Sequence, residues 1–257
     1  MGKIIAVANQ KGGVGKSTTV INIAAYLGSR DFKVLCVDSD PQGNTTTGFG
    51  IKKKSVPAST YDVITGKTRI QDAIIPTEFK NVSIVPATED LAGCELELAQ
   101  NENRVNRLKM QLLTCKEDFD YIFIDCPPAL GTITINGIVA CDSVIVPMLA
   151  EFYALEGLSQ LVNTIKIVKN NYNPALQIEG ILFTMFDGRL NVANDVVESP
   201  PASDNPFNTL LYFCHPALLG LAPNTSLFPP QNVPFLYVTV RMLPSKSKKA
   251  DLGLMLS

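Results

Sequence analysis

Residues 10–18 read QKGGVGKST, and this stretch decides the fold. It follows a short apolar run, IIAVAN (4–9), and precedes a segment (17–28) whose apolar residues recur at helical spacing. A glycine-rich turn between a strand and a helix lets backbone N–H groups surround phosphates, and the helix N-terminus adds a positive dipole end. In this pattern Lys16 is predicted to bind the β- and γ-phosphates and the Ser17 hydroxyl to bind Mg²⁺. The loop residues expected to contact a nucleotide are Lys11, Gly12, Gly13, Val14, Gly15, Lys16, Ser17 and Thr18.

The rest of the first 198 residues alternates between strand-like and helix-like segments. Apolar strand candidates occur at 33–40, 82–87, 121–128, 143–148 and 178–186, and helix-length segments at 89–116, 132–141 and 154–171. Strands that are apolar throughout are covered on both faces. We therefore expect an α/β fold, a mostly parallel P-loop NTPase sheet with helices on both faces.

Acidic residues end two of these strand candidates. Asp38 and Asp40 lie in VDSDPQGN (37–44), and Asp125 follows the apolar run YIFI (121–124) as in a Walker B strand. Carboxylates at the carboxyl ends of parallel strands lie where ligands bind, and they can hold Mg²⁺ or orient an attacking water. Two prolines (127–128) then end the strand and begin a loop able to sense the γ-phosphate. A capped turn with solvated acids is the alternative for residues 37–44.

The loop departs from the usual P-loop pattern because Gln10 replaces the first glycine and Lys11 adds a second lysine. KGGVGKST resembles the deviant Walker A motif of the ParA/MinD superfamily. The resemblance implies that Lys11 reaches the partner's nucleotide in an ATP-bound homodimer, whereas a solvated loop lysine is the alternative. DPQGN (40–44) is similar to the ParA element, which implies that Asp40 orients the water and Asp38 supports the metal. Ser17, Asp40 and Asp125 are the implied Mg²⁺ ligands.

Three further stretches, 93–99, 151–161 and 181–189, resemble the ParA/Soj branch. The resemblance implies that Glu151 contacts the nucleotide or the partner subunit and that Arg189 binds DNA non-specifically, although each is also typical of a solvated surface residue. It implies a slow ATPase that binds DNA in its ATP state and releases it on hydrolysis. The resemblance also implies a ParB-like centromere-binding partner that stimulates this hydrolysis. The implied location is the cytoplasm, in association with the nucleoid.

Composition limits the other functions. A net charge of −2 excludes a globally basic nucleic-acid binder, so DNA contact must come from a local patch or from several copies. Six cysteines without a CxxC pair and a single histidine argue against a zinc site or a disulfide framework. No apolar stretch reaches the ~18 residues of a membrane span. A MinD-like membrane-surface regulator needs a basic amphipathic C-terminal helix, which the proline-broken end does not predict.

The last 59 residues differ in composition from the rest. Residues 199–257 hold 9 of the 17 prolines and only two of the 24 acids, and nothing in them resembles the family. We divide the chain into an ATPase domain (1–198), incomplete at its C-terminal end, and an irregular proline-rich tail (199–257). The break predicts a shifted reading frame in the gene or its record, with a divergent C-terminal module as the alternative. In the first case the chain could be an inactive product of a damaged partition gene, with one sheet edge uncovered.

Overall fold

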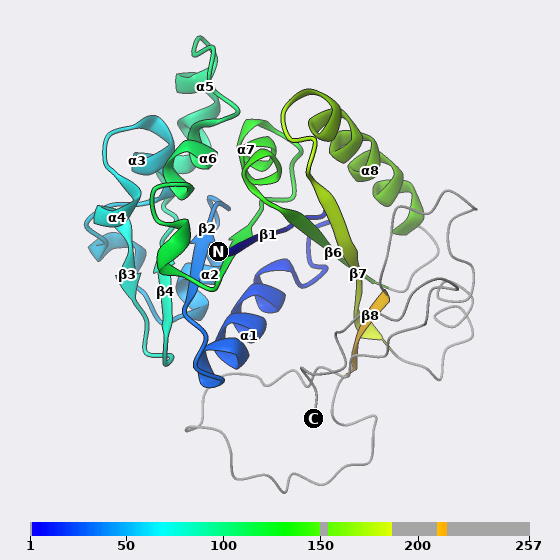
Figure 1. Cartoon of the computed structure of the whole chain (residues 1–257), viewed down its shortest axis with the longest axis horizontal. Helices are drawn as coiled ribbons and strands as arrows, with labels where there is room; N and C mark the ends of the chain where they lie inside the picture. Colours follow the sequence, from blue (N-terminus) through cyan, green and yellow to red (C-terminus); the bar gives the residue numbers. More distant parts are fainter. Residues whose placement is uncertain (1, 150–153, 187–209, 215–257) are drawn as a thin grey trace, which may run out of the picture.

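The computed structural model describes residues 2–149, 154–186 and 210–214, along which strands and helices alternate as predicted (Figure 1). The strands are β1 (Lys3–Val7), β2 (Val34–Asp38), β3 (Ile75–Pro76), β4 (Val82–Val85), β5 (Tyr121–Asp125), β6 (Ser143–Leu149), β7 (Gln177–Phe186) and β8 (Leu210–Cys214). The α-helices are α1 (Lys16–Ser29), α2 (Asn44–Gly48), α3 (Thr60–Thr65), α4 (Ile70–Ala73), α5 (Cys94–Leu98), α6 (Arg107–Leu112), α7 (Thr132–Ala140) and α8 (Ala154–Asn171). Three 3₁₀ turns are η1 (Lys53–Ser55), η2 (Glu89–Gly93) and η3 (Lys116–Asp118).

The strands form one sheet in the order β3-β4-β2-β5-β1-β6-β7-β8. Every neighbouring pair is parallel except β3 and β4, which confirms the mostly parallel α/β fold. Parallel neighbours end at the same edge of the sheet. Val7 of β1 lies opposite Asp125 of β5, and Asp125 lies opposite Asp38 of β2. The start of the glycine-rich loop after β1 therefore lies beside the two aspartates, at the carboxyl edge of the sheet.

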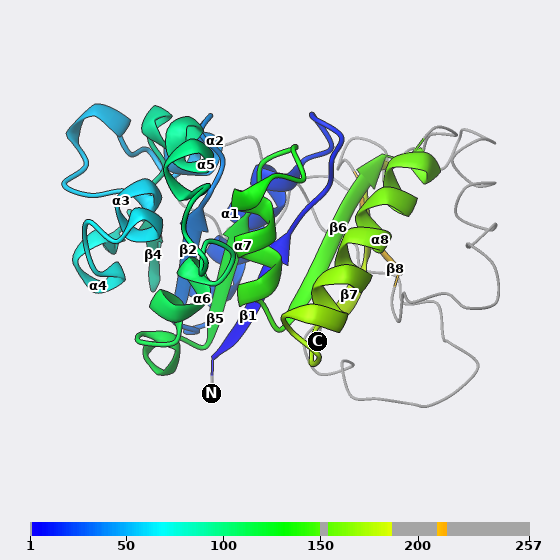
Figure 2. The same cartoon turned by 90° about the horizontal axis from the view of Figure 1, so that it is seen from above.

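Helices cover both faces of the sheet, and each face has its own buried core. Ile5 and Val7 of β1 join Val20 of α1 in one cluster. Ile4 and Ala6, which point to the other face, join buried residues of α7 and α8 in the second cluster. Figure 2 shows α7 and α8 beside one another along the sheet. The alternation along β1 follows from the two-residue period of a strand, and it fixes α1 against the sheet so that its N-terminus meets the carboxyl edge.

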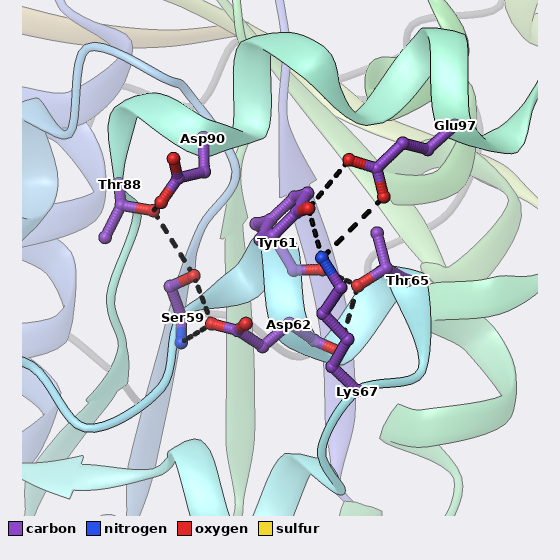
Figure 3. Close-up of polar contacts among 8 residues, drawn as sticks. All are labelled: Ser59, Tyr61, Asp62, Thr65, Lys67, Thr88, Asp90 and Glu97. Carbon is purple, nitrogen blue, oxygen red and sulfur yellow. Dashed lines mark hydrogen bonds and ion pairs between the residues drawn. The ribbon is translucent and has the colours of Figure 1, made fainter.

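A polar network on the surface ties α3 to α5 (Figure 3). The Ser59 backbone N–H and hydroxyl both donate to Asp62 Oδ2, at 2.9 and 2.8 Å, and cap α3. The Tyr61 hydroxyl donates to Glu97 Oε1 at 2.7 Å, and the Lys67 ammonium lies 4.1 Å from the centre of the Tyr61 ring. The contacts of the buried Ser59 fix the start of α3, whose first residue contacts the site described below.

The helix predicted over 89–116 is wrong in extent, because this segment contains η2, α5 and α6 with turns between them. The sequence AQNENRVN (99–106) separates α5 from α6. Asn101 Oδ1 accepts a hydrogen bond from the Asn103 N–H at 2.9 Å, and the Asn106 N–H donates to Asn103 O at 3.0 Å. Asparagine side chains that bind the nearby backbone favour turns over a continuous helix.

The tail contributes a strand to the sheet. Leu210, Leu211 and Tyr212 of β8 pair in parallel with Ile181, Leu182 and Phe183 of β7. β8 thus occupies the edge of β7 that we expected to be uncovered. The remaining residues of 199–257 lie outside the described residues.

Two further expectations concern the environment of the chain. Within the described ranges, no helix is both long enough and apolar enough to cross a membrane. The described cysteines, at positions 36, 94, 115, 126 and 141, are free thiols, and all five are buried. Burial raises the pKa of each of these thiols, so their protonated forms are favoured.

Candidate active site at the carboxyl edge of the sheet

The glycine-rich loop joins the end of β1 to the first turn of α1. Gly13 and Gly15 adopt φ angles of +74° and +82°, a region that only glycine enters readily, and Gly15 caps the helix that begins at Lys16. The Thr19 N–H donates to Gly15 O at 2.8 Å, so the backbone N–H groups before it lack partners within α1. The free donors and the helix dipole make this loop a site for an anion such as phosphate.

Lys16 is buried at this helix start, with 7 % of its surface exposed. Its ammonium donates to Lys11 O at 3.2 Å and therefore lies folded back across the loop. Burial lowers the pKa of Lys16, while the neighbouring carboxylates of Asp125 and Asp40 raise it. A buried cation between an anion-binding loop and carboxylates is suited to bridge phosphate oxygens.

Two residues that the sequence did not single out hold the loop in place. Asn9 is buried; its amide donates to Pro147 O at 2.6 Å, and its carbonyl oxygen accepts from the Lys11 N–H at 3.0 Å. The Thr184 hydroxyl of β7 donates to Val14 O at 2.8 Å. The loop is thus attached to both β6 and β7, and Lys11 is fixed through its backbone while its surface is exposed. That Lys11 acts across a dimer stays a prediction.

Three predicted aspartates converge beside the loop. Asp38 and Asp125 end neighbouring strands in register and are fully buried, and Asp40 is 7 % exposed. The Gln42 N–H donates to Asp40 Oδ1 at 2.9 Å, which fixes the turn that follows β2. The structure therefore brings together the carboxylates and the Lys16 ammonium that the sequence assigned to one site.

Two threonines of α2 bind these carboxylates, and neither was predicted from the sequence as a site residue. The Thr45 hydroxyl donates to Asp125 Oδ2 at 2.7 Å. The Thr46 N–H and hydroxyl both donate to Asp38 Oδ2, at 2.7 and 2.6 Å. On the backbone side, the Thr60 hydroxyl at the start of α3 donates to Asp38 O at 2.6 Å. A signal was present in the polar run NTTT (44–47), which directly follows the acidic turn.

Burial controls the protonation of the two strand-end aspartates. It raises the pKa of Asp38 to about 6, although hydrogen bonds from Thr46 oppose the change. Burial and, after it, the negative charge of Asp38 raise the pKa of Asp125 to about 7, against hydroxyl contacts from Ser17 and Thr45 that lower it. A bound cation would favour the ionised carboxylates, because its positive charge offsets the cost of burying their negative charge.

The same residues fit a magnesium ion bound together with phosphate. Asp125 Oδ1 is buried and, among the described residues, has no hydrogen-bond partner. The Ser17 hydroxyl, one residue after Lys16, interacts with the same carboxylate. No group of three or more His, Cys, Asp or Glu side chains that could hold a metal occurs in the part of the chain that the structure describes. Mg²⁺ is commonly held by one or two carboxylates together with water and substrate phosphates, and a hydroxyl and carboxylate match that donor set.

The loop after β5 lies between the carboxylates and α7. The Thr134 hydroxyl donates to Ala129 O at 2.5 Å and to Pro127 O at 3.4 Å. The Glu95 carboxylate of α5 approaches Gly131 so closely that an added Cβ would lie 2.0 Å from Oε1. A shift of this loop would therefore change its contacts with both α7 and α5. Glu151 and Arg189 lie outside the described residues, so their predicted roles have no structural counterpart here.

Comparison with known proteins agrees with this geometry. A family model described as an AAA domain matches residues 2–178. The chromosome partitioning protein ParA of Myxococcus xanthus is 50% identical over 198 residues, covering 77% of this chain and 70% of that protein. The chain belongs to the ParA/Soj family of partitioning ATPases. The sporulation initiation inhibitor protein Soj of Bacillus subtilis is also 50% identical over 198 residues, with coverage of 77% and 78%.

A solved structure extends the agreement to three dimensions. Cobyrinic acid a,c-diamide synthase from Mycobacterium smegmatis, with a bound ATP analogue and magnesium, has a TM-score of 0.74 to this chain. The two are 40% identical, and the match covers 77% of this chain and 78% of that one. The P-loop NTPase α/β fold predicted from the sequence is thereby confirmed.

Proposed function

We propose that this chain is an ATP-dependent, dimerising switch in DNA segregation that binds DNA in its ATP state and releases it on hydrolysis. The observation that carries the proposal is the buried Lys16 at the start of α1, beside the buried carboxylates of Asp38, Asp40 and Asp125. Family membership supports it, because the curated ParA relative is named for chromosome partitioning. The synthase activity named for the mycobacterial protein belongs to that protein, which is less similar to this chain.

ATP and Mg²⁺ are the cofactors that this site fits. The loop N–H groups and Lys16 bind the β- and γ-phosphates, as the structural relative with an ATP analogue and magnesium supports. The Ser17 hydroxyl and the carboxylates of Asp125 and Asp40 would hold Mg²⁺, and Asp38 supports them from the neighbouring strand. When bound, the ion neutralises charge that builds up on the phosphate oxygens.

Hydrolysis then depends on two further groups. Asp40 orients the attacking water, because its turn is fixed beside the loop while part of its surface stays exposed. Lys11 of one subunit stabilises the phosphates bound to the other, in the manner of an arginine finger. The loop at 127–131 transmits the presence of the γ-phosphate to α7 through Thr134.

DNA binding is weak per subunit and is doubled by dimerisation. Because the net charge is −2, the affinity for DNA must come from a few basic side chains. Arg189 is the one that the family resemblance assigns. Glu151 contacts the nucleotide or the partner subunit. A ParB-like protein that recognises a specific DNA site stimulates the slow hydrolysis, and the complex resides in the cytoplasm on the nucleoid. The ATPase domain spans residues 1–198, and the tail spans 199–257.

The experiment compares the full chain with Lys16→Ala and Arg189→Glu. Sedimentation with ATP, ADP or no nucleotide measures dimerisation, calorimetry measures ATP binding, and filter binding on two unrelated duplexes over a salt series measures DNA affinity. We expect Lys16→Ala to lose ATP binding, because the buried counter-charge to the phosphates is removed. We expect Arg189→Glu to keep ATP binding and to reduce the salt slope of DNA binding by about 0.9 per lost phosphate contact.

The outcomes separate the parts of the proposal. Unchanged ATP affinity in folded Lys16→Ala would remove the phosphate-binding assignment of the loop. Strong preference for one duplex, or DNA binding that is indifferent to ATP, would refute the partition switch even if ATP binds.

A further inference from the structure

Two consecutive threonines on α2 bind two different aspartates of the site. Thr45 and Thr46 are both fully buried, and they bridge the carboxyl ends of β5 and β2. Their contacts differ in one respect. Thr46 also accepts a hydrogen bond from the Ala87 N–H at 2.9 Å, so its hydroxyl belongs to the framework of the fold as well as to Asp38. Among the described residues, the Thr45 hydroxyl has its hydrogen bond with Asp125 and no second one to the framework of the fold.

The hydrogen bond from Thr45 places the two carboxylate oxygens of Asp125 in different environments. Oδ2 accepts the Thr45 hydroxyl at 2.7 Å, whereas Oδ1 is buried without a hydrogen-bond partner among the described residues. A buried carboxylate oxygen without a donor is costly, unless a group outside the protein satisfies it. The branched side chain of threonine also limits rotation about χ1, so the donor is fixed in place.

We propose that Thr45 is a positioning residue for the cation: by holding Asp125 Oδ2 it keeps Oδ1 directed to the bound Mg²⁺. The inference rests on the proposed function, because it concerns how the same site holds its metal. α2 follows the Asp40 turn directly, and the Thr47 N–H donates to Gly43 O at 3.0 Å at the start of the helix. Movement of that turn would therefore move the Thr45 hydroxyl, which couples the Asp40 turn to the metal ligand on β5.

The alternative is that Thr45 only satisfies a buried carboxylate and contributes to stability. The two readings differ in how nucleotide binding depends on Mg²⁺. Replacing a residue that only stabilises the fold lowers the unfolding temperature of the nucleotide-free chain. Replacing a positioning residue changes the Mg²⁺ concentration needed for nucleotide binding and leaves metal-free binding unchanged. Residues that orient metal ligands change metal affinity by about 10–100-fold when they are replaced.

The experiment uses the full chain and three variants: Thr45→Val, which removes the hydroxyl at nearly constant volume, Thr45→Ser, which retains it, and Thr47→Val. Thr47 lies on the same helix, and its hydroxyl donates to Gly43 O at 3.0 Å rather than to a carboxylate, so it is the matched control. Calorimetry with ADP measures binding over a Mg²⁺ titration and in EDTA. Thermal unfolding of each variant is recorded in parallel.

We expect Thr45→Val to raise the Mg²⁺ concentration for half-maximal ADP binding by about 10–100-fold, with ADP binding in EDTA unchanged. Thr45→Ser should recover most of this loss, and Thr47→Val should match the wild type. Equal Mg²⁺ dependence in wild type and Thr45→Val would overturn the proposal, as would an equal loss with and without Mg²⁺. If Thr45→Val does not fold, Thr45→Cys against Thr45→Ser gives the same comparison, because a thiol is a weak donor.

Failure of this inference and failure of the proposed function give different results. A wild-type chain that binds ADP with Mg²⁺ but forms no ATP-dependent dimer refutes the switch and leaves the role of Thr45 intact. A wild-type chain that dimerises with ATP, beside a Thr45→Val variant of normal Mg²⁺ dependence, refutes the role of Thr45 alone.

Discussion

Asp125→Asn should make the nucleotide-free chain more stable at neutral and alkaline pH while it removes Mg²⁺-dependent nucleotide binding. Burial raises the pKa of Asp125 to about 7 from an ordinary value of 3.8. A pKa change of one corresponds to about 1.4 kcal/mol, so ionisation costs the empty fold on the order of 4 kcal/mol. Part of this cost is the repulsion between Asp125 and Asp38, which titrate together. We therefore expect the free energy of unfolding of the variant to exceed that of the wild type by about 2–4 kcal/mol at about pH 8.

The sign follows from proton binding. The folded state holds its proton to a higher pH than the unfolded state, so stability is full below the ordinary pKa and falls as pH rises through about 7. The wild-type free energy of unfolding should therefore decrease between about pH 4 and pH 7, and the decrease should be smaller in Asp125→Asn. The amide oxygen can still accept from Thr45, and the amide nitrogen takes the place of Oδ1, which has no hydrogen-bond partner among the described residues.

Urea unfolding at several pH values, without nucleotide, measures this change. Asp118→Asn is the control, because it removes the same charge from an exposed position in η3. An Asp125→Asn variant that is less stable than the wild type at about pH 8, or that keeps the full pH dependence, would refute the argument that this carboxylate is buried at a cost to the fold. The expected result would show that nucleotide binding requires a carboxylate whose negative charge destabilises the nucleotide-free fold.

The remaining predictions concern the loop and the dimer. Gly15→Ala should destabilise the chain by about 1–2 kcal/mol more than Gly12→Ala in urea unfolding. Gly15 has a φ of +82° and an added Cβ 3.3 Å from Thr184 Cγ2, whereas an added Cβ at Gly12 has nothing within 4 Å; equal values would contradict the loop conformation. Asp40→Ala should keep ATP binding and lose turnover by about 10²–10⁴-fold. Mixing it with Lys11→Ala should restore part of the hydrolysis in mixed dimers, because one site then has its own Asp40 and its partner's Lys11, and no recovery in verified mixed dimers would count against action in trans.

The site could be predicted from the sequence where its geometry is local or follows from the sheet. The loop, Lys16 and the start of α1 are consecutive, so their spacing alone predicts an anion site. Asp38 and Asp125 are far apart in the chain, yet both end buried parallel strands, and this rule places them at one edge. The prediction needed no knowledge of side-chain packing.

The supporting residues could not be predicted in the same way. Thr45 contacts a residue 80 positions later, and Thr184 contacts a carbonyl 170 positions earlier. Asn9 lies two residues beyond the end of β1, where an asparagine is also typical of an ordinary turn. Each of these contacts depends on which strands become neighbours and on the rotamer of one side chain. Residue type and periodicity carry neither kind of information.

The tail shows the same limit and bears on the site through β7. Residues 199–209 contain three prolines, whereas LLYFC (210–214) contains none and is apolar, so it can pair as a strand. Periodicity could not select this run over FLYVTV (235–240), which lies outside the described residues, because pairing with β7 is a long-range contact. β7 carries Thr184, which donates to the loop at Val14 O and to Met148 O of β6. A paired β7 keeps its backbone fixed, so β8 stabilises the strand that holds the glycine-rich loop. Whatever the origin of the tail, the site therefore depends on it for a strand that pairs with β7 at this edge of the sheet.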